Sequence, residues 1–298
     1  MKFGAIDIGT NAVRLLIGEV SESKGAPFIK KASYIRIPLR LGIDVFENGI
    51  ISDGKIVELQ KTIQSFKLIS QVFNVVDLRT CATSAMREAD NGDEVRRYIH
   101  HMTGVDIEII SGEEEAKLIL SNFLMGKYKV SDDFIVIDIG GGSTEISVFN
   151  KGELSASSSF GLGTIRLLKS KVDKNEWKRS KDWIGKNIRI SKGSLVFVTG
   201  GNINRVHKLL GKKSSEGIGI VEFEEFSNKI LKMTPSERTS EYKLSTDRAE
   251  VIGPACEICH HLFDAIGCKN INVPRIGLSD GMIHKLHKKH QRHKVLVG

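Results

Sequence analysis

A four-residue motif, Ile-Asp-Ile-Gly, occurs twice in this chain, at residues 6–9 and again at residues 137–140. In each copy an apolar, β-prone run ends in the aspartate, the glycine begins a turn, and a second β-prone run follows. The elements predicted around the two copies also follow in the same order. We therefore interpret the chain as an internal duplication of one α/β unit.

Hydrophobic periodicity predicts a similar plan in both halves. The first half reads βββαβαβα: an antiparallel three-strand meander, then a helix capped by Ser52, then alternating strands and helices. The elements after the meander strands Lys2–Ile8, Ala12–Val20 and Phe28–Ile37 are expected at residues 52–73, Val75–Thr80, Asp93–His101, Asp106–Ile110 and Glu113–Gly126. In the second half, the expected strands and helices are Phe134–Ile139, Thr144–Phe149, Glu153–Phe160, a helical stretch from Gly163 through Ile190, Leu195–Thr199, Gly201–Leu210, Thr246–Ile266, Asn270–Val273 and Gly281–His290.

The bulk composition narrows the class of protein. The 298 residues are 40% hydrophobic, which is enough for two modest domains with cores of their own. No run of 18 apolar residues and no signal-peptide pattern is present, so we expect a cytoplasmic protein without a membrane span. The four cysteines are too few and too uneven for a disulfide framework. The net charge of +8 favours anionic partners, but the basic residues are not interleaved with aromatics, so no specific nucleic acid is expected.

The two Gly turns suit phosphate binding. A glycine lets backbone N–H groups approach an anion without a Cβ in the way. A carboxylate beside such a cradle, Asp7 or Asp138, makes sense if Mg²⁺ bridges it to the phosphate, and Glu145 offers a further ligand. Taken singly, each loop reads as an ordinary hairpin with a surface acid, whereas the pair favours phosphate. A third turn, residues 199–202 (Thr-Gly-Gly-Asn), enters a helix whose N-terminus either attracts an anion or is simply a helix-entry turn.

These segments together resemble the superfamily of acetate kinase, sugar kinases, heat-shock chaperones and actin. Four further segments resemble the exopolyphosphatase and guanosine pentaphosphate phosphohydrolase (Ppx/GppA) family, in a short form without the extra C-terminal helical domain. They match its S-G-x-E-E-A, T-x-x-x-R-x-A, G-x-G-x-V-R and L-x-D-G patterns at Ile110–Ala116, Thr83–Ala89, Gly161–Leu167 and Leu278–Gly281. The matches keep the family's order from residue 5 to about residue 285.

The resemblance implies a fold and an activity. The fold is α/β, with two duplicated actin-like, ribonuclease H-like lobes around a central cleft. Lobe I is residues 1–122 plus 282–298, and lobe II is residues 123–281. The implied activity is a hydrolase dependent on Mg²⁺, or another divalent cation such as Mn²⁺, that releases terminal orthophosphate from inorganic polyphosphate. Guanosine pentaphosphate, a substrate that would link the protein to the stringent response, is the alternative. The rival hypothesis from a different functional class is a non-hydrolytic sensor of nucleotides or polyphosphate. In either case the protein is expected to be a monomer or a homodimer.

The resemblance also assigns residues. Glu115 matches the catalytic glutamate that activates water, and Asp7, Asp138 and Glu145 match or face the metal-associated acids. The expected phosphate-binding residues are Gly9, Thr10, Asn11, Arg14, Arg87, Gly140, Gly141, Gly142, Ser143, Gly201 and Asn202. A surface arginine is the alternative for Arg14. For Glu115 the alternative is a solvated first helical turn, and the run of three glutamates at 113–115 is expected to raise their pKa values by mutual repulsion.

Three features depart from the pattern or stay open. Ala12 stands where family members often carry Ser or Thr, and His284 stands where they often carry Arg, so phosphate grip is expected to differ there. Cys256 and Cys259 form a CxxC motif that suits buried helix thiols better than zinc. The tail with His284, His287, His290 and His293 reads as a solvated, fraying basic helix, or alternatively as a surface on which a long polyanion lands.

Overall fold

The computed structural model of the chain describes residues 1–23, 26–123, 133–190 and 194–297. It divides into two compact units, residues 1–130 with 276–298, and residues 131–275. Each unit has a sheet and helices of its own. Among the described residues, no helix is both long and apolar enough to span a bilayer.

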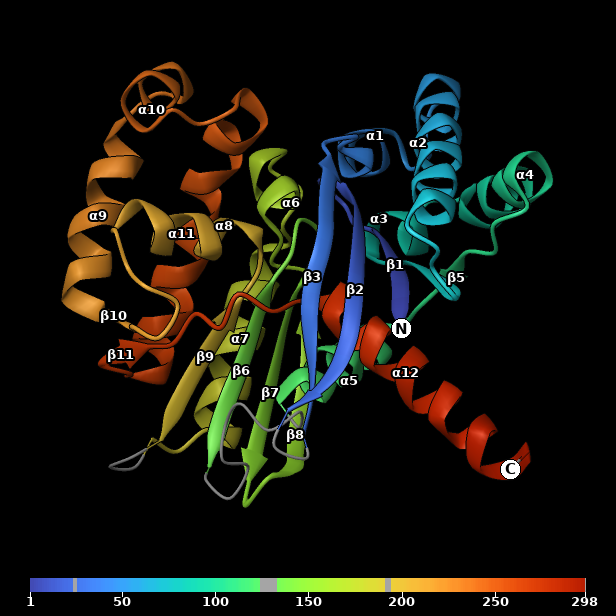
Figure 1. Cartoon of the computed structure of the whole chain (residues 1–298). Coiled ribbons are helices and arrows are strands. Elements are labelled where there is room, and N and C mark those ends of the chain that lie inside the picture. The colour runs from blue at the N-terminus through green and yellow to red at the C-terminus, as the bar shows by residue number, and fades with distance from the viewer. Residues whose placement is uncertain (24–25, 124–132, 191–193, 298) are drawn as a thin grey trace. The chain divides into compact units, whose positions relative to one another are not determined.

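The first unit is built on a five-stranded sheet with the order β3-β2-β1-β4-β5. β1 runs antiparallel to β2 and parallel to β4, and β2 runs antiparallel to β3, so the predicted meander is confirmed. The meander strands lie side by side in blue in Figure 1. The strand bounds are β1 Lys2–Ile8, β2 Val13–Ser23, β3 Ala26–Ile37, β4 Asp77–Ala82 and β5 Glu108–Ile109.

Six helices complete the described part of the first unit. They are α1 Leu41–Asn48, α2 Asp53–Val72, α3 Ser84–Glu88, α4 Gly92–Thr103, α5 Gly112–Phe123 and α12 Leu278–Val297. The sequence did not reveal α1 and α3, which are short. The predicted end of the fifth helix, at Gly126, lies outside the described residues.

The last helix differs most from its prediction. α12 begins at Leu278 and packs against α5, β1 and β2, with Met282, Ile283 and Leu286 buried. His284 is also buried, only 3% exposed. The expectation of a solvated, fraying helix is therefore wrong for α12 as far as Leu286, because one face of this helix belongs to the core of the unit. His293 belongs to the part of the tail whose side chains the structure does not describe.

The second unit repeats the sheet order as β8-β7-β6-β9, with the same strand directions. Its strands are β6 Phe134–Ile139, β7 Thr144–Asn150, β8 Glu153–Phe160 and β9 Leu195–Thr199, and a separate pair joins β10 Ile218–Gly219 to β11 Asn270–Ile271. The helices are α6 Thr164–Leu168, α7 Lys174–Asn187, α8 Gly201–Leu209, α9 Ile220–Lys232, α10 Pro235–Tyr242 and α11 Thr246–Ile266. The single helical stretch expected through Ile190 is in fact two helices, and α9 and α10 were not predicted.

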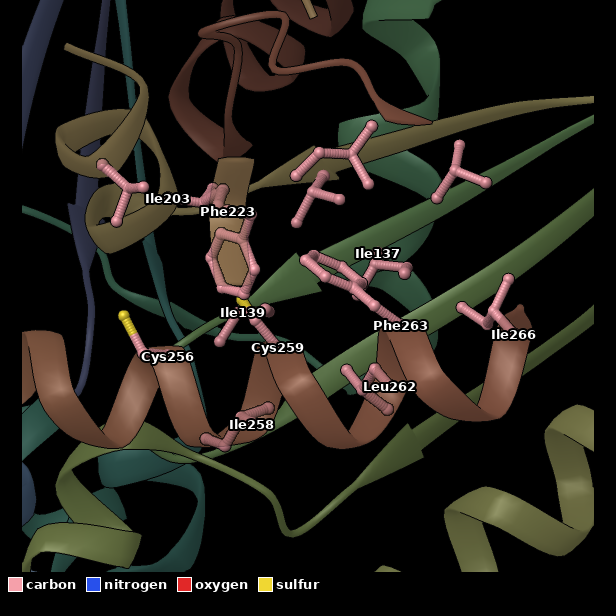
Figure 2. Close-up of a cluster of buried hydrophobic side chains, with 14 of the residues drawn as sticks. Ile137, Ile139, Ile203, Phe223, Cys256, Ile258, Cys259, Leu262, Phe263 and Ile266 are labelled. Carbon is pink, nitrogen blue, oxygen red and sulfur yellow. The ribbon is translucent and has the colours of Figure 1, made fainter. Parts of the chain in front are cut away.

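The core of the second unit forms where α11 packs beside β6. Figure 2 shows Ile137 and Ile139 with residues of α11, including Cys256, Cys259 and Phe263. Burial raises the pKa of Cys256 to about 11, so its thiol stays protonated. No third candidate ligand joins these two cysteines among the described residues. The CxxC motif thus packs a helix face, as the thiol interpretation predicts.

Candidate functional site

The turn between β1 and β2 is closed by a hydrogen bond from the Gly9 N–H to the Ala12 carbonyl, 3.1 Å long. The carbonyls of Thr10 and Asn11 accept from backbone N–H groups at the start of α1, at 2.9 and 3.1 Å. The Asn11 Oδ1 atom is buried and has no hydrogen-bond partner among the described residues. The start of α1 therefore occupies two backbone carbonyls of this turn, whereas the Asn11 side-chain oxygen stays available as an acceptor.

The turn between β6 and β7 repeats this construction. The Gly140 N–H donates to the Ser143 carbonyl at 2.9 Å, which matches the closing bond of the first turn. The carbonyls of Gly140, Gly141 and Gly142 accept from the Thr164 N–H, the Ile165 N–H and the Arg166 Nε at 3.1, 2.8 and 2.8 Å. The start of α6 therefore occupies the carbonyls of the second turn, as α1 does in the first unit.

Gly163 makes this docking of α6 onto the turn possible. A Cβ atom at Gly163 would lie 2.2 Å from the Gly142 carbonyl carbon and 2.4 Å from the Gly141 oxygen. The N–H groups of Gly141 and Gly142 have no hydrogen-bond partner among the described residues. A pair of unoccupied N–H groups on a glycine turn is the local chemistry of an anion cradle.

A row of polar side chains crosses the second sheet beside this turn. Thr199, Asp138, Glu145 and Ser159 are successive cross-strand partners on β9, β6, β7 and β8, so they lie on one face. Thr199 Oγ1 donates to Asp138 Oδ1 at 2.5 Å, and the hydroxyls of Ser143 and Ser159 donate to Glu145 Oε1 at 2.6 and 2.8 Å. These hydroxyl groups orient the two carboxylates. A hard divalent cation suits two such oxygen donors.

The corresponding positions of the first unit hold one acidic and one basic residue instead of two acidic residues. Asp7 holds the position of Asp138, and its β2 partner is Arg14, where the second unit has Glu145. Arg14 Nη1 donates to Asp7 Oδ2 at 2.7 Å. On β4 the neighbour of Asp7 is Cys81, whose pKa burial raises to about 12. Asp7 is therefore already charge-paired in this unit, although its proposed role as a metal ligand stays untested.

Glu115 lies in the first turn of α5 and is 9% exposed. Its Oε2 atom is 3.9 Å from Arg87 Nη1, an ion-pair distance, and the same nitrogen donates to the Ile110 carbonyl at 2.8 Å. Arg87 belongs to α3, which follows β4 directly. The first unit thus brings together two of the residues that the sequence singled out, a candidate base and a candidate phosphate ligand.

The three consecutive glutamates do not share one environment. Glu113 pairs with Lys117 at 2.5 Å on the exposed side of α5. Glu114 accepts from Lys285 at 2.7 Å, and this hydrogen bond lowers the pKa of Glu114. The expectation that mutual repulsion raises their pKa values is wrong for Glu114, because the helix turns successive side chains toward different partners.

The third glycine turn connects β9 to α8, as predicted. Gly200 has a φ of +121°, and a Cβ there would lie 2.4 Å from the Ile139 carbonyl oxygen. Gly201 and Asn202 form the first turn of α8, directly after Thr199 of the polar row. The turn is thus tied to the Asp138 site through its first residue.

The C-terminal Leu-x-Asp-Gly segment has structural contacts. Asp280 accepts from Lys31 of β3 at 2.8 Å and from the Gly277 N–H at 3.1 Å. The Nδ1–H of His284 donates to the Ser121 carbonyl at 3.1 Å, and burial lowers the pKa of His284 to about 4. A neutral, buried histidine gives this position no charge for a phosphate. Ala12 is fully buried and contributes its carbonyl to the first turn.

Sequence reasoning missed three contributors to the site. The start of α1 was unrecognised because this helix has only eight residues. Ser159 was missed because a serine in a strand has many roles, although the alternation of serines at 155, 157 and 159 marked one polar face. Thr199 was quoted within its motif but not as a partner of Asp138, which depends on the β6–β9 register.

The architecture of the two units identifies the fold class of the protein. Each places an aspartate at the end of the first strand of a meander, before a turn whose carbonyls a helix N-terminus occupies, which is the duplicated actin-like, ribonuclease H-like α/β architecture. In comparisons with known proteins, the model of the Ppx/GppA phosphatase family matches residues 21–290. The chain belongs to this family, and with it to the hydrolases of phosphoanhydrides.

Individual relatives agree with this assignment. The chain is 24% identical over 303 aligned positions to exopolyphosphatase 1 of Mycobacterium leprae, which covers 95% of this chain and 88% of that protein. It is 31% identical over 201 positions to a bifunctional 3-dehydroquinate synthase/phosphatase of Fusobacterium nucleatum, but this match covers 62% of the chain and only 30% of that protein. The crystal structure of an exopolyphosphatase from Cytophaga hutchinsonii has the same fold, with a TM-score of 0.81 at 21% identity over 96% of this chain and 97% of that one.

Proposed function

We propose that this protein is a divalent-cation-dependent exopolyphosphatase that releases terminal orthophosphate from inorganic polyphosphate. The observation that carries the proposal is the pairing of Asp138 with Glu145 on adjacent strands beside a glycine turn with unoccupied N–H groups. Two carboxylates on adjacent strands offer the oxygen ligands that Mg²⁺ prefers. An anion cradle next to that cation suits a phosphoanhydride.

The residues are proposed to divide the chemistry as follows. Mg²⁺ or Mn²⁺, held by Asp138 and Glu145, would neutralise phosphate charge as it builds in the transition state. The N–H groups of the two glycine turns, with Arg14 and Arg87, bind and orient the phosphate chain. Glu115 accepts a proton from water as the water oxygen bonds to the terminal phosphorus. The bond from that phosphorus to the bridging oxygen breaks, and the shortened chain leaves with the bridging oxygen.

The position of Glu115 supports its role as a base. Its carboxylate is buried in the first turn of α5 and lies at ion-pair distance from Arg87, a candidate phosphate ligand, so it is held beside the expected position of the substrate. Its neighbour Glu113 is exposed and paired with Lys117. Glu113 therefore offers a matched control on the same helical turn.

The test compares phosphate release from long-chain polyphosphate with Mg²⁺ by the wild type, Glu115→Gln, Glu145→Gln and Glu113→Gln. We expect Glu115→Gln to lose about 10²-fold or more in rate, as removal of a general base does. Glu145→Gln should also lose activity, because it removes a proposed metal ligand, whereas Glu113→Gln should keep most of the rate. Equal rates for Glu115→Gln and the wild type refute the proposed base. Release from guanosine pentaphosphate alone would move the substrate to that nucleotide, and binding without turnover would favour a sensor.

A further inference from the structure

A groove of about 1010 Å³ lies in the first unit, away from the glycine turn, where α12 crosses the start of β4. Its walls come from α2, β4, the segment that leads into β5, and α12. The groove is large enough for a small ligand with several charged groups. None of its lining residues is one to which a role in hydrolysis is proposed above.

The groove is strongly cationic. Six basic and three acidic residues line it, a net charge of +3. The basic residues are Lys67, Arg79, Lys285, Lys288, Lys289 and Arg292. Two of the acids are already paired, Glu108 with Arg79 and Asp106 with His100. Lys288, Lys289 and Arg292 are exposed, and no carboxylate partner is found for them among the described residues.

One donor in the groove wall lacks a partner. The side chain of Arg79 is 10% exposed; its Nε and Nη2 atoms bind Glu108 at 3.0 and 2.7 Å, but its Nη1 atom is buried without a hydrogen-bond partner. A buried donor without an acceptor costs free energy, so such a group usually marks a ligand or water site. This atom is shielded from water, so a ligand reaches it once the long lysine and arginine side chains shift.

The lining indicates which anion fits. Lys285, Lys288, Lys289 and Arg292 repeat along one side of α12 over about 10 Å, at 1.5 Å per residue. This spacing suits an extended anion with several charges better than a single phosphate. The described lining residues include no aromatic side chain on which a base could stack. We propose that this groove is a second anion site that binds an inorganic oligophosphate chain, separate from the residues that carry out hydrolysis.

The test measures binding of tripolyphosphate calorimetrically in EDTA at low ionic strength, where turnover is blocked and charge interactions are strong. We expect Lys288→Ala/Lys289→Ala to weaken binding by about tenfold, since each exposed pair contributes up to roughly 1 kcal/mol. Lys178→Ala/Lys181→Ala, which removes two exposed lysines from α7 of the other unit, is the matched control and should bind like the wild type.

A second variant tests the built part of the site. Arg79→Lys keeps the charge but removes the unpartnered Nη1 donor, so it should weaken binding by about three- to tenfold, the value of one hydrogen bond. A merely basic surface would be indifferent to this change, because the charge stays the same.

The outcomes separate this proposal from the proposed function. If Arg14→Ala abolishes tripolyphosphate binding while the lysine pair and Arg79→Lys leave it unchanged, the groove is not an oligophosphate site. A protein that binds in the groove but releases no phosphate with Mg²⁺ would overturn the hydrolase and leave the groove standing. If both proposals hold, chain length shows whether the groove binds the far end of the substrate or a separate oligophosphate. If it binds the far end of the substrate, Lys288→Ala/Lys289→Ala should weaken the binding of long chains more than that of tripolyphosphate. If it binds a separate ligand, the variant should weaken both equally.

Discussion

Replacing Gly281 with alanine should disturb the helix that carries Glu115. An ideal Cβ atom at Gly281 would lie 1.9 Å from the Leu118 carbonyl oxygen and 2.6 Å from its carbonyl carbon. Both of these atoms are backbone, so no side chain can turn aside. Since Cβ contacts below 3.0 Å essentially do not occur, α12 and α5 must separate locally by about 1.1 Å.

The cost follows from the packing at this crossing. Overpacking a well-filled interior costs about 1–3 kcal/mol. In a unit of this size each kcal/mol shifts the melting temperature by about 2–4 °C, so a fall of roughly 2–12 °C is expected. Leu118 lies one turn after Glu115 on α5. A displacement near 1 Å at a catalytic group lowers a rate by about 10²-fold, so phosphate release should fall even where the protein remains folded.

The control is Gly54→Ala in α2 of the same unit, where a Cβ meets no atom within 4 Å. Alanine is the better helix former by about 1 kcal/mol, so Gly54→Ala should raise the melting temperature slightly. Differential scanning calorimetry and polyphosphate hydrolysis are measured for both variants. If Gly281→Ala also raises the melting temperature and keeps full activity, the argument from the close helix crossing is refuted.

Three further predictions concern single contacts. Burial lowers the pKa of His284 to about 4, so the unfolded chain binds a proton on this residue more readily than the folded protein does. The free energy of unfolding should therefore fall as the pH drops from 6.5 toward 4, by up to about 1.4 kcal/mol per pH unit. Denaturant titrations of His284→Gln should show a flatter pH dependence. Gly163→Ala places a Cβ 2.2 Å from the Gly142 carbonyl carbon, so calorimetry should show destabilisation of at least about 2 kcal/mol. Arg14→Met leaves Asp7 without its cation and should cost about 2 kcal/mol in urea unfolding, but markedly less in an Asp7→Asn background, since only the charged aspartate needs the cation.

The elements that the sequence predicted well are those with a local signal. The strands Lys2–Ile8 and Phe134–Ile139 have apolar runs that end in aspartate and glycine, and both occur with the expected bounds. Helix α11 has a continuous apolar periodicity over its 21 residues. In these elements the local sequence determines the backbone conformation, so the hydrophobic pattern is sufficient to predict the strand or helix.

The features that were missed, among them helix α1, the end of α6 at Leu168 and the burial of α12, depend on contacts between distant segments. α1 and α6 are eight and five residues long, too short to be stable alone, and each is held where its N–H groups meet a glycine turn. α12 looks basic and solvated in sequence because His284 and several lysines surround its buried apolar residues. Its burial results from packing against α5 and the sheet, with Gly281 at the point of closest approach to α5.

The candidate site was predictable in its residue types but not in its pairings. Asp7 and Asp138 look equivalent in sequence, and the duplicated strand orders make them equivalent in position. Their β2 and β7 neighbours decide their chemistry, and these neighbours are known only once the register is known: Arg14 for Asp7, Glu145 for Asp138. A cation beside Asp7 would compete with the Arg14 guanidinium, whereas Glu145 beside Asp138 adds a second carboxylate. The duplication thus gives the chain two similar turns, but the strand beside each turn presents a basic residue in the first unit and an acidic residue in the second.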